Sequence, residues 1–431
     1  MKLIVHKTEK IQGEATPPAS KSQTIRSILL GVLARGTSTL LNPLESQDTK
    51  DAVAAARSLG AKVAVKKGSI VVTSAGAPLL KAKNKLHTGN SGVTTHLFMP
   101  VMGLRGRGAK PVLFNCGEQM RKRPLTPLTS ALKNLGLRIS GSVPPFSISG
   151  ELTGGTTDVA GRMSQYLSAL LISLPLAPND SVVTALDLGE KPYVEMTEAL
   201  LREQKIRYTH TKTRRGDVYA IKGRQTYRPF KKQVAGDFSS ASYLIAAGAL
   251  FPGTVVLKGL DMNEPQGDKI LIEILRDMGA QIQIERNKEI GNRLIIKGGK
   301  PLKGIKIDAN AIPDLVPTFA VIGTQAKGKT EIVNVGQARI KETDRLRSMT
   351  EGLSRLGADI TERPDSLVVR QSALCGAKVR GFGDHRTVMA LSLAGMLAKG
   401  KTEIDTAEAI EKTFPAFVKV MQELGGKLNM R

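Results

Sequence analysis

The stretch GTSTLL at Gly36–Leu41 is a small turn that leads into a run of residues with high β propensity. The same signature returns five more times, in steps of 72, 72, 73, 75 and 72 residues. Such a fixed period indicates a fold built from copies of one structural unit. The other copies begin at Gly108, Asp180, Gly253, Gly328 and Gly400.

Two kinds of helix are predicted around each turn. The helix before the turn has a polar start and an apolar body, and Tyr166–Leu176 and Tyr243–Phe251 are apolar on nearly all sides, which is typical of buried helices. The helix after the turn is amphipathic, and in five copies a glycine follows its last residue, which ends a helix at little cost. The buried helices are expected to begin near Ser22, Gly92, Ser164, Ser239, Asp314 and His385.

The sequence therefore predicts an α/β protein of six repeated βαβαββ-type units, three per domain, with buried helices pointing inward and sheets outside. A length of 431 residues fits two or three domains. One domain is expected to span 19–231, and the other to combine 1–18 with 232–431. The chain would cross between them near 16–20 and near 227–236, where proline-containing stretches precede new units.

The composition limits the class of ligand. The chain has 63 Lys and Arg against 38 Asp and Glu, a net charge of +25, which favours anionic partners. The cations are spread along the whole chain, and six Tyr, ten Phe and no Trp supply few side chains for stacking on bases. We therefore interpret the charge as a diffuse solvated surface and expect no nucleic acid partner.

The sequence also favours a cytoplasmic protein. Cys116 and Cys375 lie outside any CxxC or zinc-type spacing, which indicates a reducing compartment. Met1–Lys10 lacks the apolar region of a signal peptide and is predicted to be a strand. The most apolar stretch, Tyr166–Ala177, is too short to cross a bilayer, so no membrane partner is expected.

One motif needs a different interpretation from its usual one. Gly323–Thr330 matches the phosphate-loop pattern GxxxxGK[ST], which requires a strand before it and a helix after it. Here an apolar helix is predicted before the motif and a strand after it, so the stretch is interpreted as a connector of the repeat.

Charged and polar residues gather at the starts of the predicted inward helices. Each group alone has a structural explanation: Lys21 and Arg26 as surface cations, Glu342–Arg345 as helix-surface pairs, Asp314 as a helix cap. Their recurrence at equivalent positions predicts one shared site, because helix N-termini favour anions. We expect such ends to form an anion-binding cleft that closes by hinge motion. The five histidines are scattered, and the carboxylates, lysines and arginines suit acid–base catalysis on a charged substrate without a metal.

At these positions the sequence resembles the 5-enolpyruvylshikimate-3-phosphate (EPSP) synthase family of enolpyruvyl transferases. The resemblance implies a two-domain, inside-out α/β barrel fold and a cytoplasmic monomer that needs no cofactor. It also implies the reaction, in which the 5-hydroxyl of 3-phosphoshikimate adds to C2 of phosphoenolpyruvate, C3 is protonated and phosphate leaves. The matching segments are PASKSQTIRSILL, TGNSG, RKRPL, SQYLSALL, KPYVEMT, GDFSSASY, IPDLVP, RIKETDRL, GDHRTVMA and KTFP, between Pro18 and Pro415.

The resemblance also implies roles for individual residues. Asp314 matches the base at the 5-hydroxyl, Glu342 matches the proton-transfer partner at the methylene carbon, and Lys21 matches a residue that touches both substrates. The residues implied to bind 3-phosphoshikimate are Lys21, Ser22, Arg26, Ser164, Gln165, Asp314, Gln337 and Lys341. Those implied to bind phosphoenolpyruvate are Lys21, Gly92, Arg123, Gln165, Arg345, Arg386 and Lys412, and Asn90, Arg162, Tyr193 and His385 match further pocket positions.

The chain departs from the family pattern at a few of these positions. Met163 and Glu190 stand where the family usually has serines that help to bind the 3-phosphate, and Arg162 is a candidate to offset the charge of Glu190. Val93 and His96 replace the usual Thr and Arg. These differences bear on substrate affinity and inhibitor response more than on the class of reaction.

Three alternatives stay open at this point. A related enolpyruvyl transferase that acts on UDP-N-acetylglucosamine has a Cys shortly before an Arg-Pro, but Cys116 has the wrong spacing to Arg123. An RNA-binding or RNA-end-processing protein of similar α/β repeats would use the +25 charge. A homologue that binds ligand without turnover would follow from Met163 and Glu190.

Overall fold

The computed structural model describes residues 1–77, 79–106, 108–286 and 292–431. The chain forms two compact units. The contiguous unit is Ala19–Val234, and the two-segment unit combines Met1–Pro18 with Ala235–Arg431. Each unit has its own hydrophobic core, so each is described by itself.

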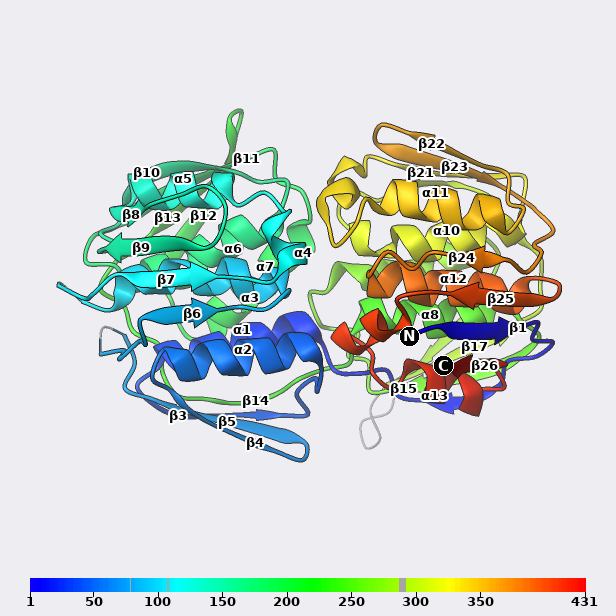
Figure 1. The fold of residues 1–431 in the computed structure, drawn as a ribbon, viewed down its shortest axis with the longest axis horizontal. Coiled ribbons are helices and arrows are strands. Elements are labelled where there is room, and N and C mark those ends of the chain that lie inside the picture. The colour runs from blue at the N-terminus through cyan, green and yellow to red at the C-terminus, as the bar shows by residue number, and fades with distance from the viewer. Residues whose placement is uncertain (78, 107, 287–291) are drawn as a thin grey trace. The chain divides into compact units, whose positions relative to one another are not determined.

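Six four-stranded sheets among the described residues share one pattern (Figure 1). An edge strand runs parallel to its neighbour, and two further strands follow antiparallel. The contiguous unit holds the sheets β14-β3-β5-β4, β6-β7-β9-β8 and β10-β11-β13-β12. Their strands are β3 Gly36–Leu41, β4 Lys62–Lys66, β5 Ser69–Ser74, β6 Lys85–His87, β7 Val112–Asn115, β8 Leu137–Ile139, β9 Phe146–Gly150, β10 Gly155–Ala160, β11 Ser181–Leu186, β12 Tyr208–Thr213, β13 Gly216–Ile221 and β14 Lys231–Gln233.

The two-segment unit repeats the pattern in the sheets β2-β15-β17-β16, β19-β21-β23-β22 and β24-β25-β1-β26. A short parallel pair, β18 with β20, forms a separate two-stranded sheet. The strands are β1 Leu3–His6, β2 Gly13–Ala15, β15 Gly253–Lys258, β16 Gln281–Glu285, β17 Arg293–Gly298, β18 Leu302–Lys303, β19 Lys306–Asp308, β20 Ala326–Lys327, β21 Lys329–Val333, β22 Ile360–Arg363, β23 Ser366–Arg370, β24 Lys378–Val379, β25 Lys401–Ile404 and β26 Leu428–Met430.

The helices between edge strand and second strand are buried along most of their length, because they are apolar on nearly all sides. Side-chain caps on Ser20, Ser91, Asp237 and Asp384 fix where four of them begin. These helices are α1 Lys21–Leu33, α3 Gly92–Phe98, α6 Ser164–Ser173, α8 Phe238–Leu250, α10 Val316–Gln325 and α12 His385–Leu397.

The other helices follow the second strand of a sheet or lie in the connections. Those after second strands bury one face, as the alternation of buried and exposed residues in α2 and α11 shows. They are α2 Gln47–Ser58, α4 Glu118–Arg121, α5 Thr126–Asn134, α7 Lys191–Glu203, α9 Leu271–Asp277, α11 Arg345–Arg355 and α13 Phe417–Glu423, with 3₁₀ turns η1 Pro100–Leu104, η2 Leu174–Leu176, η3 Gly267–Ile270, η4 Pro313–Leu315, η5 Gly336–Ile340 and η6 Ala407–Lys412.

The chain passes between the units twice. Directly before each passage, a short strand pairs at the edge of a sheet in the unit that the chain is leaving. β2 pairs with β15 in the two-segment unit just before α1 begins the contiguous unit. β14 pairs with β3 just before α8 begins the return, so residues 231–234 belong to the contiguous unit. The phosphate-loop-like stretch runs from the end of α10 into β21, and no helix follows it.

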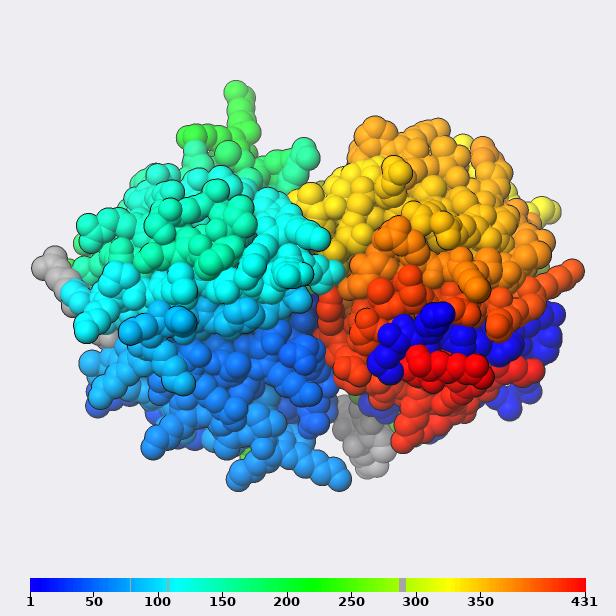
Figure 2. Space-filling view, viewed as in Figure 1, coloured from blue at the N-terminus to red at the C-terminus, as the bar shows by residue number. Residues whose placement is uncertain are grey.

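The first and last strands of the chain share one sheet. β1 lies between β25 and β26, with Leu3 opposite both Ile404 and Met430. Figure 2 shows the dark-blue N-terminal residues set among red C-terminal ones on the surface of the two-segment unit. Within the described residues, no helix combines the length and the apolar character needed to cross a membrane.

Candidate active site

The predicted site residues fall into two groups, one in each unit. In the contiguous unit they lie at the N-terminal ends of α1, α3, α6 and α7 and in the loop after α4. In the two-segment unit they lie in η4 and η5, at the starts of α11 and α12, and at the end of η6. Helix starts present free backbone N–H groups, which favour anions.

Lys21 forms an ion pair at the start of α1. The helix begins there because the Ser20 side chain accepts a hydrogen bond from the Gln23 backbone N–H at 3.4 Å. The Nζ atom of Lys21 lies 3.2 Å from Asp48 Oδ2 in the first turn of α2, with both side chains largely buried. Ser22, the next residue, is half-buried.

Arg26 lies one turn further along α1 and is 1% exposed. Its Nε donates to Thr197 Oγ1 at 2.9 Å, and one Nη donates to Ser168 Oγ and to the Tyr193 carbonyl, both at 3.3 Å. Burial lowers the pKa of Arg26 to about 10, and the negative charge of Glu190 opposes this shift. Arg26 therefore joins α1 to α6 and α7 as a cation with neutral hydrogen-bond partners.

Arg123 lies against the start of α3. A Cβ built on Gly92 would lie 2.5 Å from Arg123 Nη1, so only glycine lets the guanidinium approach the backbone this closely. The Asn90 side-chain oxygen accepts from the backbone N–H groups of Gln119 at 3.1 Å and Met120 at 3.3 Å. Asn90 thus ties the turn before α3 to the loop that carries Arg123.

At the start of α6, the Ser164 backbone N–H and hydroxyl donate to Glu190 Oε2 at 3.2 and 2.8 Å. Both residues are 1% exposed. Arg162 lies on the surface instead, where its Nε pairs with Asp187 at 2.7 Å. Tyr193, in the first turn of α7, is buried and accepts from Arg26 through its carbonyl.

His96, for which the sequence predicts no role, lies beside Gln165. The His96 Nδ1 atom lies 2.7 Å from both the Gly92 carbonyl and Gln165 Oε1, and its ring meets the Tyr166 ring edge-on. Both neighbours are acceptors, so Nδ1 carries the proton and fixes the orientation of the Gln165 amide. Only the spacing Gly92–His96, one helical turn, was a signal of this contact.

In the two-segment unit, Arg345 lies at the centre of an ionic cluster. Its guanidinium is 2.6 Å from Asp314 Oδ1, 2.6 Å from Glu342 Oε2 and 2.8 Å from Asp384 Oδ2. Arg345 and Asp384 are almost fully buried, and Asp384 also caps α12 by accepting from the Arg386 backbone N–H. Burial opposes the charge of Arg345, but Asp384, Glu342 and Asp314 outweigh it and raise the pKa of Arg345 above its usual range.

Asp314 bridges two arginines. Its second oxygen accepts from Arg386 at 2.7 Å, and Lys341 adds a further positive charge nearby. Burial alone would raise the pKa of Asp314, but the charges of Arg386 and Arg345 prevail and hold it well below its usual range. Asp314 is therefore an anion in the ligand-free protein.

The remaining predicted residues of this unit surround the cluster. Gln337 in η5 donates to the Asn310 carbonyl at 2.8 Å, and Lys341 directly follows η5. The Nζ atom of Lys412 donates to the Gly383 carbonyl at 3.0 Å, just before α12. His385 is buried, with Nδ1 3.4 Å from Asp384 Oδ1.

A second buried carboxylate was not singled out from the sequence. Asp268 accepts a hydrogen bond from the Ser239 hydroxyl at the start of α8, and Gln266 donates to Ser239 at 3.0 Å. Burial raises the pKa of Asp268 to about 7, and the charge of Asp314 adds to the rise. Ser239 lies in the GDFSSASY segment, but Asp268 stands outside every segment used for prediction.

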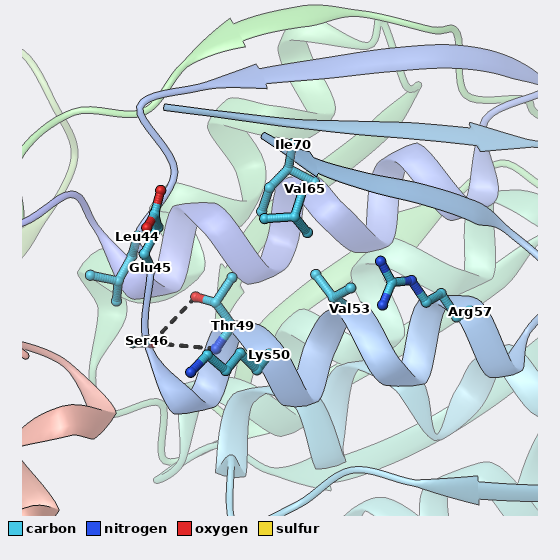
Figure 3. Close-up of a pocket in the computed structure, with 9 residues that line it drawn as sticks. All are labelled: Leu44, Glu45, Ser46, Thr49, Lys50, Val53, Arg57, Val65 and Ile70. Carbon is cyan, nitrogen blue, oxygen red and sulfur yellow. Dashed lines mark hydrogen bonds between the residues drawn. The ribbon is translucent and has the colours of Figure 1, made fainter. Parts of the chain in front are cut away.

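A pocket of about 330 Å³ lies elsewhere, between α2 and the β4–β5 hairpin (Figure 3). Its wall includes Val53, Arg57, Val65 and Ile70, and Ser46 at its edge accepts from the Thr49 backbone N–H at 3.3 Å. It contains no predicted site residue. In the part of the chain that the structure describes, no group of three or more His, Cys, Asp or Glu side chains is arranged to hold a metal ion.

The chain is similar to one known family over almost its entire length. The model of the family described as EPSP synthase (3-phosphoshikimate 1-carboxyvinyltransferase) matches residues 5–421. The 3-phosphoshikimate 1-carboxyvinyltransferase of Acetivibrio thermocellus is 42% identical, covering 99% of this chain and 99% of that protein. The enzyme of the same name from Methanocaldococcus jannaschii is 38% identical, covering 100% of this chain and 99% of that protein.

Solved structures show the same architecture. The EPSP synthase of Acinetobacter baumannii superposes with a TM-score of 0.83 at 25% identity, covering 100% of this chain and 99% of that one. The enolpyruvyl transferase NikO of Streptomyces tendae superposes with a TM-score of 0.79 at 16% identity, covering 99% of this chain and 98% of that one, and shows similarity of fold alone. The mixed α/β fold is thus the inside-out arrangement of the first of these structures.

Proposed function

Because the chain belongs to the EPSP synthase family, we propose that the two groups of residues described above bind 3-phosphoshikimate and phosphoenolpyruvate and catalyse the transfer between them. The activity is that of a 3-phosphoshikimate 1-carboxyvinyltransferase. The reaction forms 5-enolpyruvylshikimate 3-phosphate and releases phosphate, a step of the shikimate pathway.

The observation that carries the residue assignments is the cluster around Arg345. Asp314 and Glu342 are held 2.6 Å from the same guanidinium, so two carboxylates are fixed near one cationic centre. We assign Asp314 as the base that removes the proton of the 5-hydroxyl, and Glu342 as the group that transfers a proton at C3 of phosphoenolpyruvate.

The ion pairs explain how Asp314 becomes a base. In the ligand-free protein Arg386 and Arg345 hold the pKa of Asp314 low, which makes its carboxylate a weak base. The carboxylate and phosphate of phosphoenolpyruvate suit guanidinium forks. When these anions engage Arg345 and Arg386, they compete with Asp314 for the same donors, and the pKa of Asp314 rises toward a useful value.

The cations and donors of the contiguous unit complete the assignment. Lys21 contacts both substrates, Arg123 and Gly92 receive phosphoenolpyruvate, and Gln165, oriented by His96, donates its amide to the substrates. We assign Ser22, Arg26, Ser164, Gln337 and Lys341 to 3-phosphoshikimate, and Lys412 to phosphoenolpyruvate. No metal or organic cofactor takes part in this scheme.

The remaining expectations also stand as proposals. We infer that each sheet and its two helices are one copy of a βαβαββ-type unit, three to a domain, because the six strand orders agree. We further propose that the protein is a cytoplasmic monomer that closes on its substrates by hinge motion near 16–20 and 227–236.

The decisive experiment measures phosphate release from phosphoenolpyruvate with and without 3-phosphoshikimate. We expect release that depends on 3-phosphoshikimate and yields equal amounts of the enolpyruvyl product. UDP-N-acetylglucosamine in place of 3-phosphoshikimate serves as the control for the related transferase and should give no release. Well-folded protein that releases no phosphate with 3-phosphoshikimate would reject the proposed function.

A further inference from the structure

The carboxylate of Glu190 occupies the N-terminal end of α6. Its Oε2 atom accepts from the Ser164 backbone N–H at 3.2 Å and from the Ser164 hydroxyl at 2.8 Å. Both residues are buried to 1% exposure, so this contact is shielded from solvent. The Glu190 carboxylate thus accepts both hydrogen bonds that Ser164 donates at the start of α6.

The backbone conformation of Glu190 is one that needs stabilising contacts from its surroundings. Glu190 has φ +49°, in the left-handed region that side chains other than glycine seldom adopt. It directly precedes α7, and the neighbouring Gly189 backbone N–H donates to the Gly161 carbonyl at 3.2 Å. Conformations of this kind persist where other contacts favour them, and the Ser164 donors supply such contacts.

Glu190 also acts on Arg26 through its charge. The negative charge of Glu190 favours the charged form of the buried Arg26 guanidinium. The hydrogen bonds of Arg26 go to neutral groups, namely the hydroxyls of Thr197 and Ser168 and the carbonyls of Ser22 and Tyr193. Glu190 therefore supplies a negative charge near this cation in the ligand-free protein.

We propose that Glu190 is a specificity-determining residue whose carboxylate occupies the subsite of the 3-phosphate in the free protein and must leave Ser164 before 3-phosphoshikimate binds. The inference rests on the proposed function, which assigns Ser164 and Arg26 to this substrate. Carboxylate and phosphate accept from the same donors and repel each other, so both cannot use Ser164 at once. Glu190 therefore weakens the preference for a phosphorylated acceptor.

The test compares acceptors with and without the phosphate. Values of kcat/KM are measured for 3-phosphoshikimate and for shikimate in the wild type, Glu190→Ser and Glu190→Gln. We expect Glu190→Ser to lower KM for 3-phosphoshikimate about tenfold, because a repulsive charge is removed, and to raise the preference over shikimate accordingly. Glu190→Gln keeps the shape of the side chain and should produce a smaller change in the same direction.

Controls separate this inference from other effects. Glu195→Ser removes the same charge from an exposed position of α7 and should change neither acceptor's kinetics. An unchanged or higher KM for 3-phosphoshikimate in folded Glu190→Ser overturns the inference while wild-type turnover keeps the proposed function. If Glu190→Ser fails to fold, the direction of the change in Glu190→Gln decides. Wild-type protein that does not use 3-phosphoshikimate overturns both.

Discussion

The buried arginines of the two units, Arg345 and Arg26, have different kinds of partner. In the two-segment unit, Arg345 is surrounded by three carboxylates within 2.8 Å, and Asp314 is shared between two arginines. In the contiguous unit, Arg26 is equally buried but donates hydrogen bonds to hydroxyl and carbonyl groups. The buried arginine of the two-segment unit is balanced by carboxylates of the same unit, whereas Arg26 donates to neutral acceptors.

Because of this difference, the two units are suited to different parts of the proposed reaction. Carboxylates whose pKa depends on nearby arginines are suited to proton transfer, because an arriving anion changes their environment. Cations and hydroxyl donors are suited to holding phosphate. The contiguous unit also has carboxylates beside two of its site residues, since Asp48 pairs with Lys21 and Glu190 accepts from Ser164.

The largest effect is expected from neutral replacements of the two proposed proton-transfer groups. Asp314→Asn and Glu342→Gln should each lower kcat about a thousandfold, the range of general acid–base catalysis, because the substituted amides cannot take up a proton. Steady-state phosphate release and circular dichroism test this expectation. Asp277→Asn, at an exposed position of α9, should retain full activity. Near wild-type turnover in Asp314→Asn or Glu342→Gln would remove the role assigned to that residue.

The second prediction compares the loss of folding stability when each of the two buried arginines is replaced. Arg345→Met removes the cation that three carboxylates share and should destabilise the protein by about 3–5 kcal/mol. Arg26→Met leaves only neutral partners unsatisfied and should cost about 1–3 kcal/mol. Urea unfolding of the ligand-free variants measures both. Equal losses of stability would show that the two units do not differ in this way.

The third prediction concerns pH and Asp268. The carboxyl titrates near 3.8 in an ordinary environment and near 7 in the folded protein, so the folded state binds the extra proton between these values. The resulting contribution to stability is complete below the lower value and is lost as pH rises through the upper one. Asp268→Asn should remove roughly 2 kcal/mol of this pH dependence. Urea unfolding at pH 5 and pH 8 checks it, and an identical pH difference in wild type and variant would contradict it.

The smallest effect is expected at His96. His96→Phe keeps a ring against Tyr166 but removes the donor that orients Gln165, so the KM of both substrates should rise about tenfold. The loss of stability should stay near 1 kcal/mol. His6→Phe, on an exposed position of β1, is the matched control. Unchanged KM values in His96→Phe would show that Gln165 does not depend on this hydrogen bond.

The repeat pattern in the sequence was the main basis for predicting where the buried helices begin. The helices that were expected to begin near Ser22, Ser164 and His385 start at Lys21, Ser164 and His385. Local signals fix such starts, because capping residues and apolar bodies are neighbours in sequence. The end of the contiguous unit was harder to place, since β14 belongs there only through its pairing with β3.

Contacts between distant segments escaped prediction from sequence. The Glu190–Ser164 and His96–Gln165 contacts join residues 26 and 69 positions apart, and no periodicity connects them. Arg162 was a candidate partner for Glu190, yet its side chain pairs with Asp187 on the surface. The direction of an exposed, flexible side chain depends on its local surroundings, which residue order alone does not reveal.

The positions of β1 and β2 bear on synthesis of the protein. These strands are synthesised before their partners, because β1 pairs with β25 and β26, and β2 pairs with β15, all of which follow much later in the chain. Residues 19–234 contain every strand of their three sheets. Since domains fold as units during translation, the contiguous unit is able to finish folding on the ribosome. The sheet that contains β1 is completed only after β26 has been synthesised.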